Sequence, residues 1–306
     1  MSWNTSDIPD LTGRRALVTG ATSGLGYHTA LELLRHGAEV FVATRNPEKS
    51  ARAAAELAAT SGREAPNVVD LDLSDLASVH TAAEQVTKSY DRLDLLVNNA
   101  GVMAPPYRQT ADGFELQFGT NHLGHFALTA QLMPLLAKAP QPRVVTVSSF
   151  MHKSVRGISQ ADLRATNNYR KWAAYGKSKL ANLLFMLELD RRARAAGMPV
   201  VSVGSHPGYA STHLQTSGPQ LDGVDLEARV MALGTRLVAQ SAAAGAWPSL
   251  YAATLPDLPT GSYVGPRLLG LRGAPKVVVP SRSARDEELA KQLWSWSVEA
   301  TGVDCF

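Results

Sequence analysis

Tyr175 and Lys179 are the residues of this sequence whose types and spacing point most directly to chemistry. They stand four positions apart in a segment of helical period, so they would lie one turn apart on one helix face. A phenol with its ordinary pKa of about 10 is a poor base at neutral pH, and a neighbouring ammonium stabilises its ionised form. The pair could therefore exchange a proton with an alcohol or carbonyl oxygen.

Two consecutive serines, Ser148 and Ser149, close an apolar run at 144–147 that predicts a strand. A hydroxyl at that strand end could donate a hydrogen bond to a substrate oxygen and stabilise negative charge developing on it. Alternation along a strand says only that the two side chains point to opposite faces. The residue types alone leave the choice between them open.

A glycine turn follows the first apolar run, at 16–19, and opens a predicted helix. Such a turn lets backbone N–H groups approach a phosphate held at the helix N-terminus, where the dipole favours negative charge. A tight turn can also need its glycines for packing alone. In the first strand–helix unit of an alternating chain, however, the turn predicts dinucleotide binding by Gly20, Ser23, Gly24, Leu25 and Gly26.

The end of the second predicted strand reads Thr44–Arg45–Asn46. NAD-binding sequences usually place an acid there, which bonds the ribose 2′-hydroxyl. A guanidinium at Arg45 would instead attract the 2′-phosphate of NADP and offer it a bidentate fork. The sequence therefore favours NADP(H), with Arg45 and Asn46 at its adenosine end. A solvated arginine at a strand end is the alternative.

Short apolar runs that alternate with segments of helical period must position these groups. Repeated strand–helix units predict an α/β fold with a doubly wound parallel sheet, helices on both faces and ligands at the carboxyl ends of the strands. We expect one domain over 1–306, with a lid at about 207–240; a mere surface excursion is the alternative. The predicted strands are 16–19, 40–43, 68–73, 93–97, 144–147 and 200–203, and the predicted helices are 26–35, 51–59, 76–88, 113–136 and 174–195, with further helical segments from 226 and near 242.

Composition excludes several classes of protein. The 306 residues are 45% hydrophobic and carry a net charge of +3, with basic residues scattered among acids, which argues against a nucleic-acid site. The single cysteine, Cys305, permits neither an internal disulfide nor a cysteine-rich metal site. We expect no metal, no membrane partner and a cytoplasmic location, because no apolar run approaches membrane-spanning length and the first ten residues are polar.

Taken in order, the motifs resemble those of the short-chain dehydrogenase/reductase family over about residues 12–265. Within the family, the sequence is most similar to the branch that holds retinol dehydrogenases, the WW-domain oxidoreductase, protochlorophyllide reductase and actinobacterial relatives. The motifs are Thr19–Gly20–x–x–x–Gly24–x–Gly26, Asn98–Asn99–Ala100–Gly101, Asn121, Val147–Ser148–Ser149, Tyr175–x–x–x–Lys179 and Pro207–Gly208.

The resemblance implies a single-domain Rossmann fold and an NADP(H)-dependent oxidoreductase that acts on a carbonyl or alcohol. It assigns catalysis to Ser149 rather than Ser148, to Tyr175 as proton donor or acceptor, to Lys179, which also bonds the nicotinamide ribose, and to Asn121, which would hold a water in a relay to Lys179. The remaining cofactor contacts that it implies are Asp72, Leu73, Asn99, Ala100, Gly101, Pro207, Gly208 and Thr212. Asp72 could equally cap the helix that follows it.

Substrate and assembly are less constrained by the sequence. Apolar candidates for the pocket indicate a hydrophobic small molecule. Homodimers or homotetramers are typical of the family. Alternative functions are an NADP-sensing or scaffold protein without catalysis, and reduction of a C=C bond. The pocket candidates are Met103, Phe150, Met151, Tyr169, Trp172, Tyr209 and Leu214.

Overall fold

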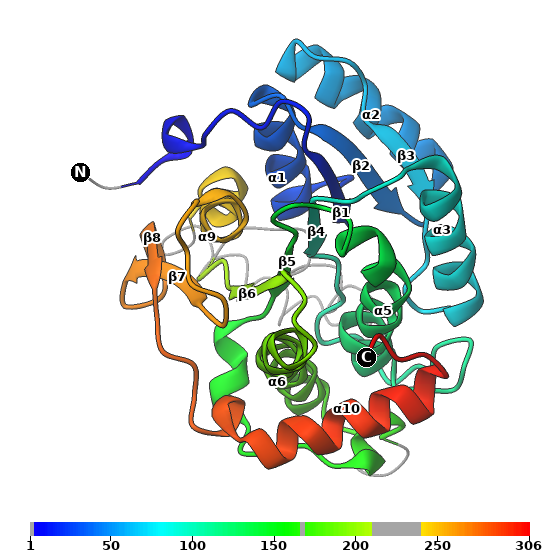
Figure 1. The fold of residues 1–306 in the computed structure, drawn as a ribbon. Coiled ribbons are helices and arrows are strands. Elements are labelled where there is room, and N and C mark those ends of the chain that lie inside the picture. The colour runs from blue at the N-terminus through cyan, green and yellow to red at the C-terminus, as the bar shows by residue number, and fades with distance from the viewer. Residues whose placement is uncertain (1–2, 166–168, 210–239) are drawn as a thin grey trace.

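An eight-stranded β-sheet forms the centre of the computed structural model, which describes residues 3–165, 169–209 and 240–306 (Figure 1). The strand order is β3-β2-β1-β4-β5-β6-β7-β8. After β3 the chain therefore crosses to the other side of β1, where β4 and the later strands are added in the opposite direction across the sheet. This order is typical of doubly wound dinucleotide-binding folds. The strands are β1 Arg15–Thr19, β2 Glu39–Thr44, β3 Asn67–Asp70, β4 Leu95–Asn98, β5 Arg143–Val147, β6 Val201–Ser205, β7 Tyr263–Leu268 and β8 Arg272–Val277.

The strands from β3 to β7 pair in parallel, as the alternation of strands and helices predicts. Their central members are covered on both faces: Ala16, Leu17 and Val18 of β1 are each at most 1% exposed. That double burial explains why the runs read as continuously apolar rather than alternating. β8 departs from the prediction, because it pairs antiparallel with β7 and closes one edge of the sheet.

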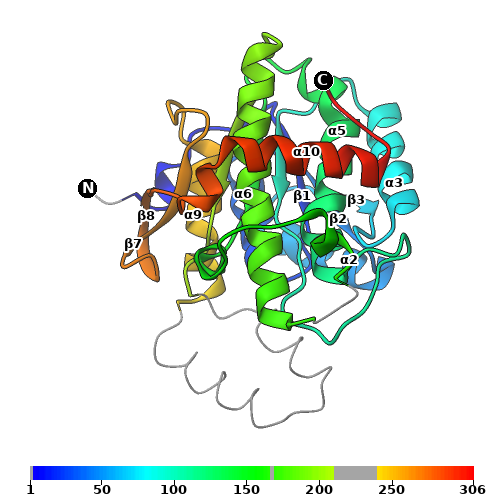
Figure 2. The same ribbon diagram turned by 90° about the horizontal axis from the view of Figure 1, so that it is seen from below.

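Helices cover both faces of the sheet. α1, α2 and α9 pack on one face, while α3, α5 and α6 pack on the other, and α10 crosses the outer side of α6 (Figures 1 and 2). In the described part of the chain, no helix is long and apolar enough to cross a bilayer. The longer helices are α1 Gly24–Arg35, α2 Pro47–Ser61, α3 Leu76–Ser89, α5 Gly124–Leu136, α6 Lys171–Ala195, α9 Ala242–Thr254 and α10 Glu287–Thr301; the short ones are η1 Thr5–Asp7, α4 Leu116–Phe118, η2 Gly119–Leu123, η3 Phe150–Ser154, η4 Gln160–Leu163 and η5 Ser283–Arg285.

The helix predicted over 113–136 begins at Leu116 and contains a π-helical turn. Its first part consists of α4 and of the wide π-helical turn η2, and α5 begins only at Gly124. π-helical turns inside helices occur frequently at functional sites. The predicted lid helix from 226, together with Thr212 and Leu214, lies outside the described residues.

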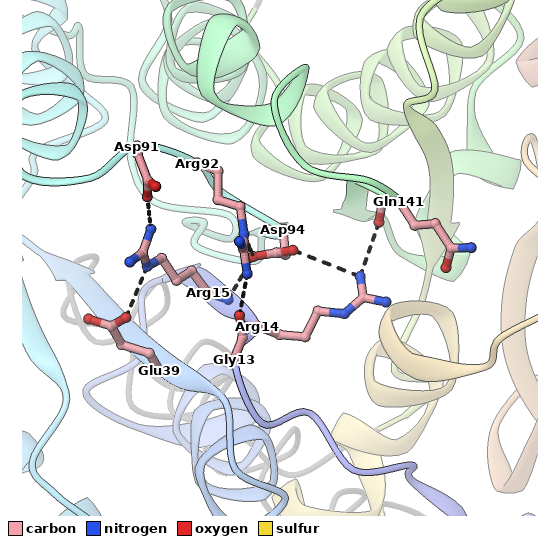
Figure 3. Close-up of polar contacts among 8 residues, drawn as sticks. All are labelled: Gly13, Arg14, Arg15, Glu39, Asp91, Arg92, Asp94 and Gln141. Carbon is pink, nitrogen blue, oxygen red and sulfur yellow. Dashed lines mark hydrogen bonds and ion pairs between the residues drawn. The ribbon is translucent and has the colours of Figure 1, made fainter.

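A network of charges joins the amino ends of the central strands, at the edge of the sheet opposite to the predicted site (Figure 3). Asp94 is 2% exposed and accepts hydrogen bonds from the Arg15 backbone N–H, at 3.0 Å, and from Arg92 Nε, at 3.2 Å. The Arg15 side chain pairs with Glu39 on β2 and with Asp91. The network therefore ties β1, β2 and the start of β4 together, leaving the carboxyl ends of the strands for ligand binding.

Candidate active site

The glycine turn after β1 is packed so closely that side chains cannot replace its glycines. Gly20 has a φ of 69°, in the left-handed region that glycine favours. A Cβ on Gly26 would lie 2.4 Å from the carbonyl oxygen of Gly20 and 2.5 Å from Asn99 Nδ2. Ser23 caps the start of α1 without using its side chain, which leaves the hydroxyl available to a ligand at this helix N-terminus.

A cleft of about 540 Å³ extends from this turn over the carboxyl ends of β2, β3 and β4. Its size, its exposed backbone and the start of α1 fit the diphosphate and adenosine parts of a dinucleotide. Twelve of the residues predicted to bind the cofactor line it: Gly20, Ser23, Gly24, Leu25, Gly26, Arg45, Asn46, Asp72, Leu73, Asn99, Ala100 and Gly101.

Two of these polar side chains also have a structural role. Asn46 Oδ1 accepts a hydrogen bond from the backbone N–H of Lys49, at 2.8 Å, and so caps α2. Asp72 accepts bonds from the Ser74 backbone and hydroxyl, at 2.9 and 2.6 Å, whereas Asp75 caps α3. Asp72 thus stabilises the turn before α3 rather than capping the helix itself.

The cleft contains two cations that the sequence analysis did not select. Lys49, in the first turn of α2, and Arg108, in the segment after β4, line it together with Arg45. Lys49 lies one helical turn beyond the capping residue Asn46, a spacing that could have identified it. Arg108 belongs to an irregular loop, and no local pattern marks its approach to the cleft.

A second cavity, of about 220 Å³, contains the predicted catalytic groups Ser149, Tyr175 and Lys179. It adjoins the cleft, because Leu25, Asn99 and Gly101 line both. Pro207 and Gly208 lie in this cavity rather than in the cleft. The other lining residues are mostly apolar: Val102, Met103, Val147, Ser148, Phe150, Met151, Trp172, Tyr209 and Leu271.

Tyr169 was expected in this cavity but lies elsewhere. Its hydroxyl donates to the carbonyl oxygen of Pro105, at 2.8 Å, and its side chain lines a separate pocket with Glu115 and Arg170. Leu271, in contrast, was not predicted. It follows β7 in sequence by three residues and reaches the cavity only because the β7–β8 hairpin folds back against Gly208, where a Cβ would lie 2.2 Å from the Leu271 carbonyl oxygen.

The two serines after β5 have different surroundings. Ser148 is buried and donates its hydroxyl to the carbonyl oxygen of Lys179, at 2.8 Å. Ser149 begins η3, where its Oγ accepts a bond from the Met151 N–H, at 3.2 Å, and its hydroxyl lowers the pKa of Tyr175, with which it lines the cavity. Ser148 thus uses its hydroxyl to hold α6 against β5, whereas Ser149 is the serine that acts on Tyr175.

Burial is the main cause of the pKa shifts of Tyr175 and Lys179. It raises the pKa of Tyr175 to about 12, and the neighbouring Ser149 hydroxyl opposes the rise only in part. It lowers the pKa of Lys179 to about 8. Lys179 Nζ lies 5.8 Å from the centre of the Tyr175 ring and donates to the Val147 carbonyl oxygen, at 3.2 Å. The lowered phenol pKa expected from the lysine is therefore not found, and Tyr175 is protonated at neutral pH.

Asn121 lies in the wide turn η2 and is fully buried. Its Oδ1 accepts a bond from the Val102 N–H, at 2.8 Å, and its Nδ2 donates to the Val102 carbonyl, at 3.0 Å, and to Ser178 Oγ, at 2.9 Å. The side chain thus joins the segment after β4 to α6, the helix that carries Tyr175 and Lys179.

Comparison with known proteins supports an oxidoreductase. A family model described as "short chain dehydrogenase" matches residues 14–220. Human retinol dehydrogenase 13 is 37% identical over 298 residues, covering 96% of this chain and 86% of that protein. Mouse polyprenol dehydrogenase is 40% identical over 300 residues, covering 97% and 86%. A crystal structure of a Mycobacterium paratuberculosis protein is 42% identical, covers all of both chains and superposes with a TM-score of 0.81.

Proposed function

The chain belongs to the short-chain dehydrogenase family, and from this premise we propose that it is an NADP(H)-dependent oxidoreductase acting on hydrophobic carbonyl compounds or alcohols. One observation carries the proposal. The buried, protonated Tyr175, with Ser149 beside it, lies in an apolar cavity that adjoins a glycine-lined cleft bearing Arg45.

The residues of the cavity suggest how the reaction proceeds. A nicotinamide bound in the cleft would supply or accept the hydride at the substrate carbon. Ser149 would donate a hydrogen bond to the substrate oxygen, and Tyr175 would give its phenolic proton to that oxygen as negative charge develops there. Lys179 would stabilise the phenolate that this transfer leaves. Asn121 fixes α6 relative to the cleft, and we retain the proposal that it holds a water in a proton relay.

The substrate class follows from the cavity and from the relatives. Met103, Phe150, Met151 and Trp172 offer apolar contact with few polar groups. Both retinol and polyprenol, which name the two relatives, are alcohols with long unsaturated hydrocarbon chains. We therefore propose a lipophilic alcohol or its carbonyl counterpart.

The activity can be tested with the purified full chain by following NADPH absorbance. A panel would pair isoprenoid and medium-chain aldehydes with polar ketones of similar reactivity. We expect NADPH oxidation with the lipophilic aldehydes and little with the polar ketones. If NADPH binds in a titration but no carbonyl or alcohol turns over in either direction, the enzymatic proposal is wrong and a cofactor-sensing role is favoured.

The cofactor preference gives a separate prediction. Because Arg45 lines the adenosine end of the cleft with Lys49 nearby, we expect NADPH to bind at least about tenfold more tightly than NADH, equivalent to about 1.4 kcal/mol. Arg45→Asp should erase or reverse this preference, because its carboxylate repels a 2′-phosphate and can bond a 2′-hydroxyl. Titration calorimetry with both cofactors measures it.

A matched control is Arg52→Asp, which makes the same charge change on the exposed side of α2, outside the cleft lining. It should leave the preference within about twofold, since exposed charges act weakly at a distance. Equal affinity of the unmodified protein for NADPH and NADH would contradict the assignment of Arg45.

A further inference from the structure

The turn between β7 and β8 exposes a leucine that contributes little to the fold. The Leu271 N–H bonds the Leu268 carbonyl, at 2.9 Å, and the two central residues, Leu269 and Gly270, have positive φ values of 54° and 71°. Hairpin turns of this kind favour asparagine or aspartate followed by glycine, because other side chains are strained there. Leu269 nevertheless occupies the strained position, and its side chain is 88% exposed.

The exposed leucine belongs to a larger apolar surface. In the part of the chain that the structure describes, eight large hydrophobic side chains are exposed, and five of them are Phe150, Leu268, Leu269, Val277 and Val279. The Phe150 ring adjoins the turn, since a Cβ on Gly270 would lie 3.8 Å from its Cδ2. We call Phe150, Leu268 and Leu269, which lie at the turn, the hairpin surface; Val277 and Val279 lie further along the chain, toward the base of the hairpin. Such clustering marks an interaction site, whereas scattered exposed apolar residues are ordinary.

The hairpin itself carries charge of one sign. Residues 258–285 contain five basic residues and no acid, and Arg267, Arg272 and Lys276 within the hairpin are exposed. Lys153 lies over the Phe150 ring, 4.7 Å from its centre. An apolar tip surrounded by cations is the pattern of a protein segment that lies in the interface of an anionic membrane.

A second copy of the chain fits this surface poorly. A symmetric contact would place the same cations against one another without a carboxylate to pair them. β8 is the edge strand, but Pro275 lacks an N–H and Lys276 adds charge, and both discourage strand pairing between copies. The chemistry therefore favours an anionic lipid surface.

We propose that the β7–β8 hairpin is a docking surface for an anionic phospholipid bilayer. Leu268 and Leu269 would enter the headgroup region, while Arg267, Arg272 and Lys276 would contact anionic headgroups. The hairpin forms an edge of the molecule in both views (Figures 1 and 2). If docking occurs, it replaces the expectation of no membrane partner, which rested on the absence of a membrane-spanning run in the sequence.

Docking would also bring the active-site cavity close to the membrane. Leu271, directly after the turn, and Phe150, in the hairpin surface, both line the cavity. A lipophilic substrate could then pass between the bilayer and the cavity without crossing bulk water. This consequence depends on the proposed function, whereas the docking itself does not.

Co-sedimentation of the full chain with vesicles tests docking without measuring activity. Vesicles of phosphatidylcholine alone would be compared with vesicles containing about one-third phosphatidylglycerol, at about 0.05 M and 0.5 M NaCl. We expect binding to the anionic vesicles at least about tenfold above the neutral ones, weakened strongly by the higher salt. No binding to anionic vesicles at low salt would overturn the proposal.

Leu269→Asn is the decisive variant, because it should separate docking from folding. Asparagine suits the left-handed position, so the melting temperature should stay the same or rise, whereas vesicle affinity should fall by about tenfold. Val68→Thr is its control, since it removes an exposed apolar side chain from β3 at the opposite edge of the sheet and should retain binding. An unchanged vesicle affinity of Leu269→Asn, or an equal loss of binding in both variants, would contradict docking through this turn.

The cations are tested in the same assay. Arg272→Gln should lower affinity for anionic vesicles about fivefold, whereas Lys88→Gln, on exposed α3, should change it less than twofold. Analytical ultracentrifugation tests whether a second copy of the chain, rather than a bilayer, covers the hairpin surface. If the unmodified chain dimerises and Leu269→Asn makes it monomeric without affecting vesicle binding, the hairpin surface pairs two copies and the proposal is wrong.

Discussion

Tyr175→Phe should lower the rate of hydride transfer by a factor of roughly 10² to 10⁴ while leaving NADPH affinity nearly unchanged. The substitution removes the transferable proton but keeps the ring, which is 8% exposed and packs in the cavity wall. Single-turnover measurement of NADPH oxidation with the best substrate of the panel, beside a binding titration, gives both quantities.

The pH dependence of the unmodified protein adds a second measurement. Because the pKa of Tyr175 is raised to about 12, the phenol keeps its proton throughout the neutral range. Its loss should therefore not limit carbonyl reduction at neutral pH, whereas alcohol oxidation, which needs the phenolate, should accelerate as pH rises.

Tyr107→Phe is the matched control. It removes a phenolic hydroxyl that donates to the Arg164 carbonyl at the surface, away from both cavities, and should keep full activity. If Tyr175→Phe stays within about threefold of the parent rate while chemistry limits turnover, another group is the acid, or the protein does not act through this site.

Lys179→Met should impair turnover and cofactor affinity together, yet stabilise the fold. The ammonium is proposed to support the phenolate and to bond the nicotinamide ribose, so we expect a loss of at least about 10²-fold in kcat/KM. Methionine is of similar length and carries no charge into this buried position, where Lys179 is 4% exposed.

The stability effect has a defined pH window. Burial lowers the pKa of Lys179 from 10.5 to about 8, so below pH 8 the lysine is charged in both the folded and the unfolded chain. There the folded state bears the full cost of the buried charge, roughly 3 kcal/mol. Between pH 8 and 10.5 the folded chain binds fewer protons, so the cost shrinks as pH rises, and above that range it is absent.

Denaturant unfolding at about pH 7 and about pH 10 should therefore show Lys179→Met more stable than the parent mainly at the lower pH. Lys177→Met is the control, because that lysine pairs with Asp162 and should give no such gain. A variant that is less stable at neutral pH, or one that keeps the parent kcat/KM, would refute the corresponding part of this prediction.

Local patterns were sufficient for much of the fold. The six strands β1–β6 and the helices α1, α3 and α6 lie close to their predicted positions, because each is an uninterrupted apolar or helical period. β7, β8 and α10 were not predicted. Gly265 and Pro266 interrupt the apolar run of β7, and β8 shows only weak alternation of apolar and polar residues. These two strands form because β7 pairs with β6 and β8 pairs with β7, and not because of a periodic sequence.

The features of the site likewise fall into those that local sequence predicts and those that depend on tertiary contacts. The sequence by itself determined the glycine turn, the Tyr175–Lys179 spacing and the basic end of β2, since each depends on residues within a turn or two of one another. Only the tertiary structure decided that the Ser148 hydroxyl is held by the Lys179 carbonyl, that Tyr169 points elsewhere and that Leu271 enters the cavity. It also decided that the pKa of Tyr175 is raised, because burial sums the contributions of elements distant in sequence, which no local spacing records.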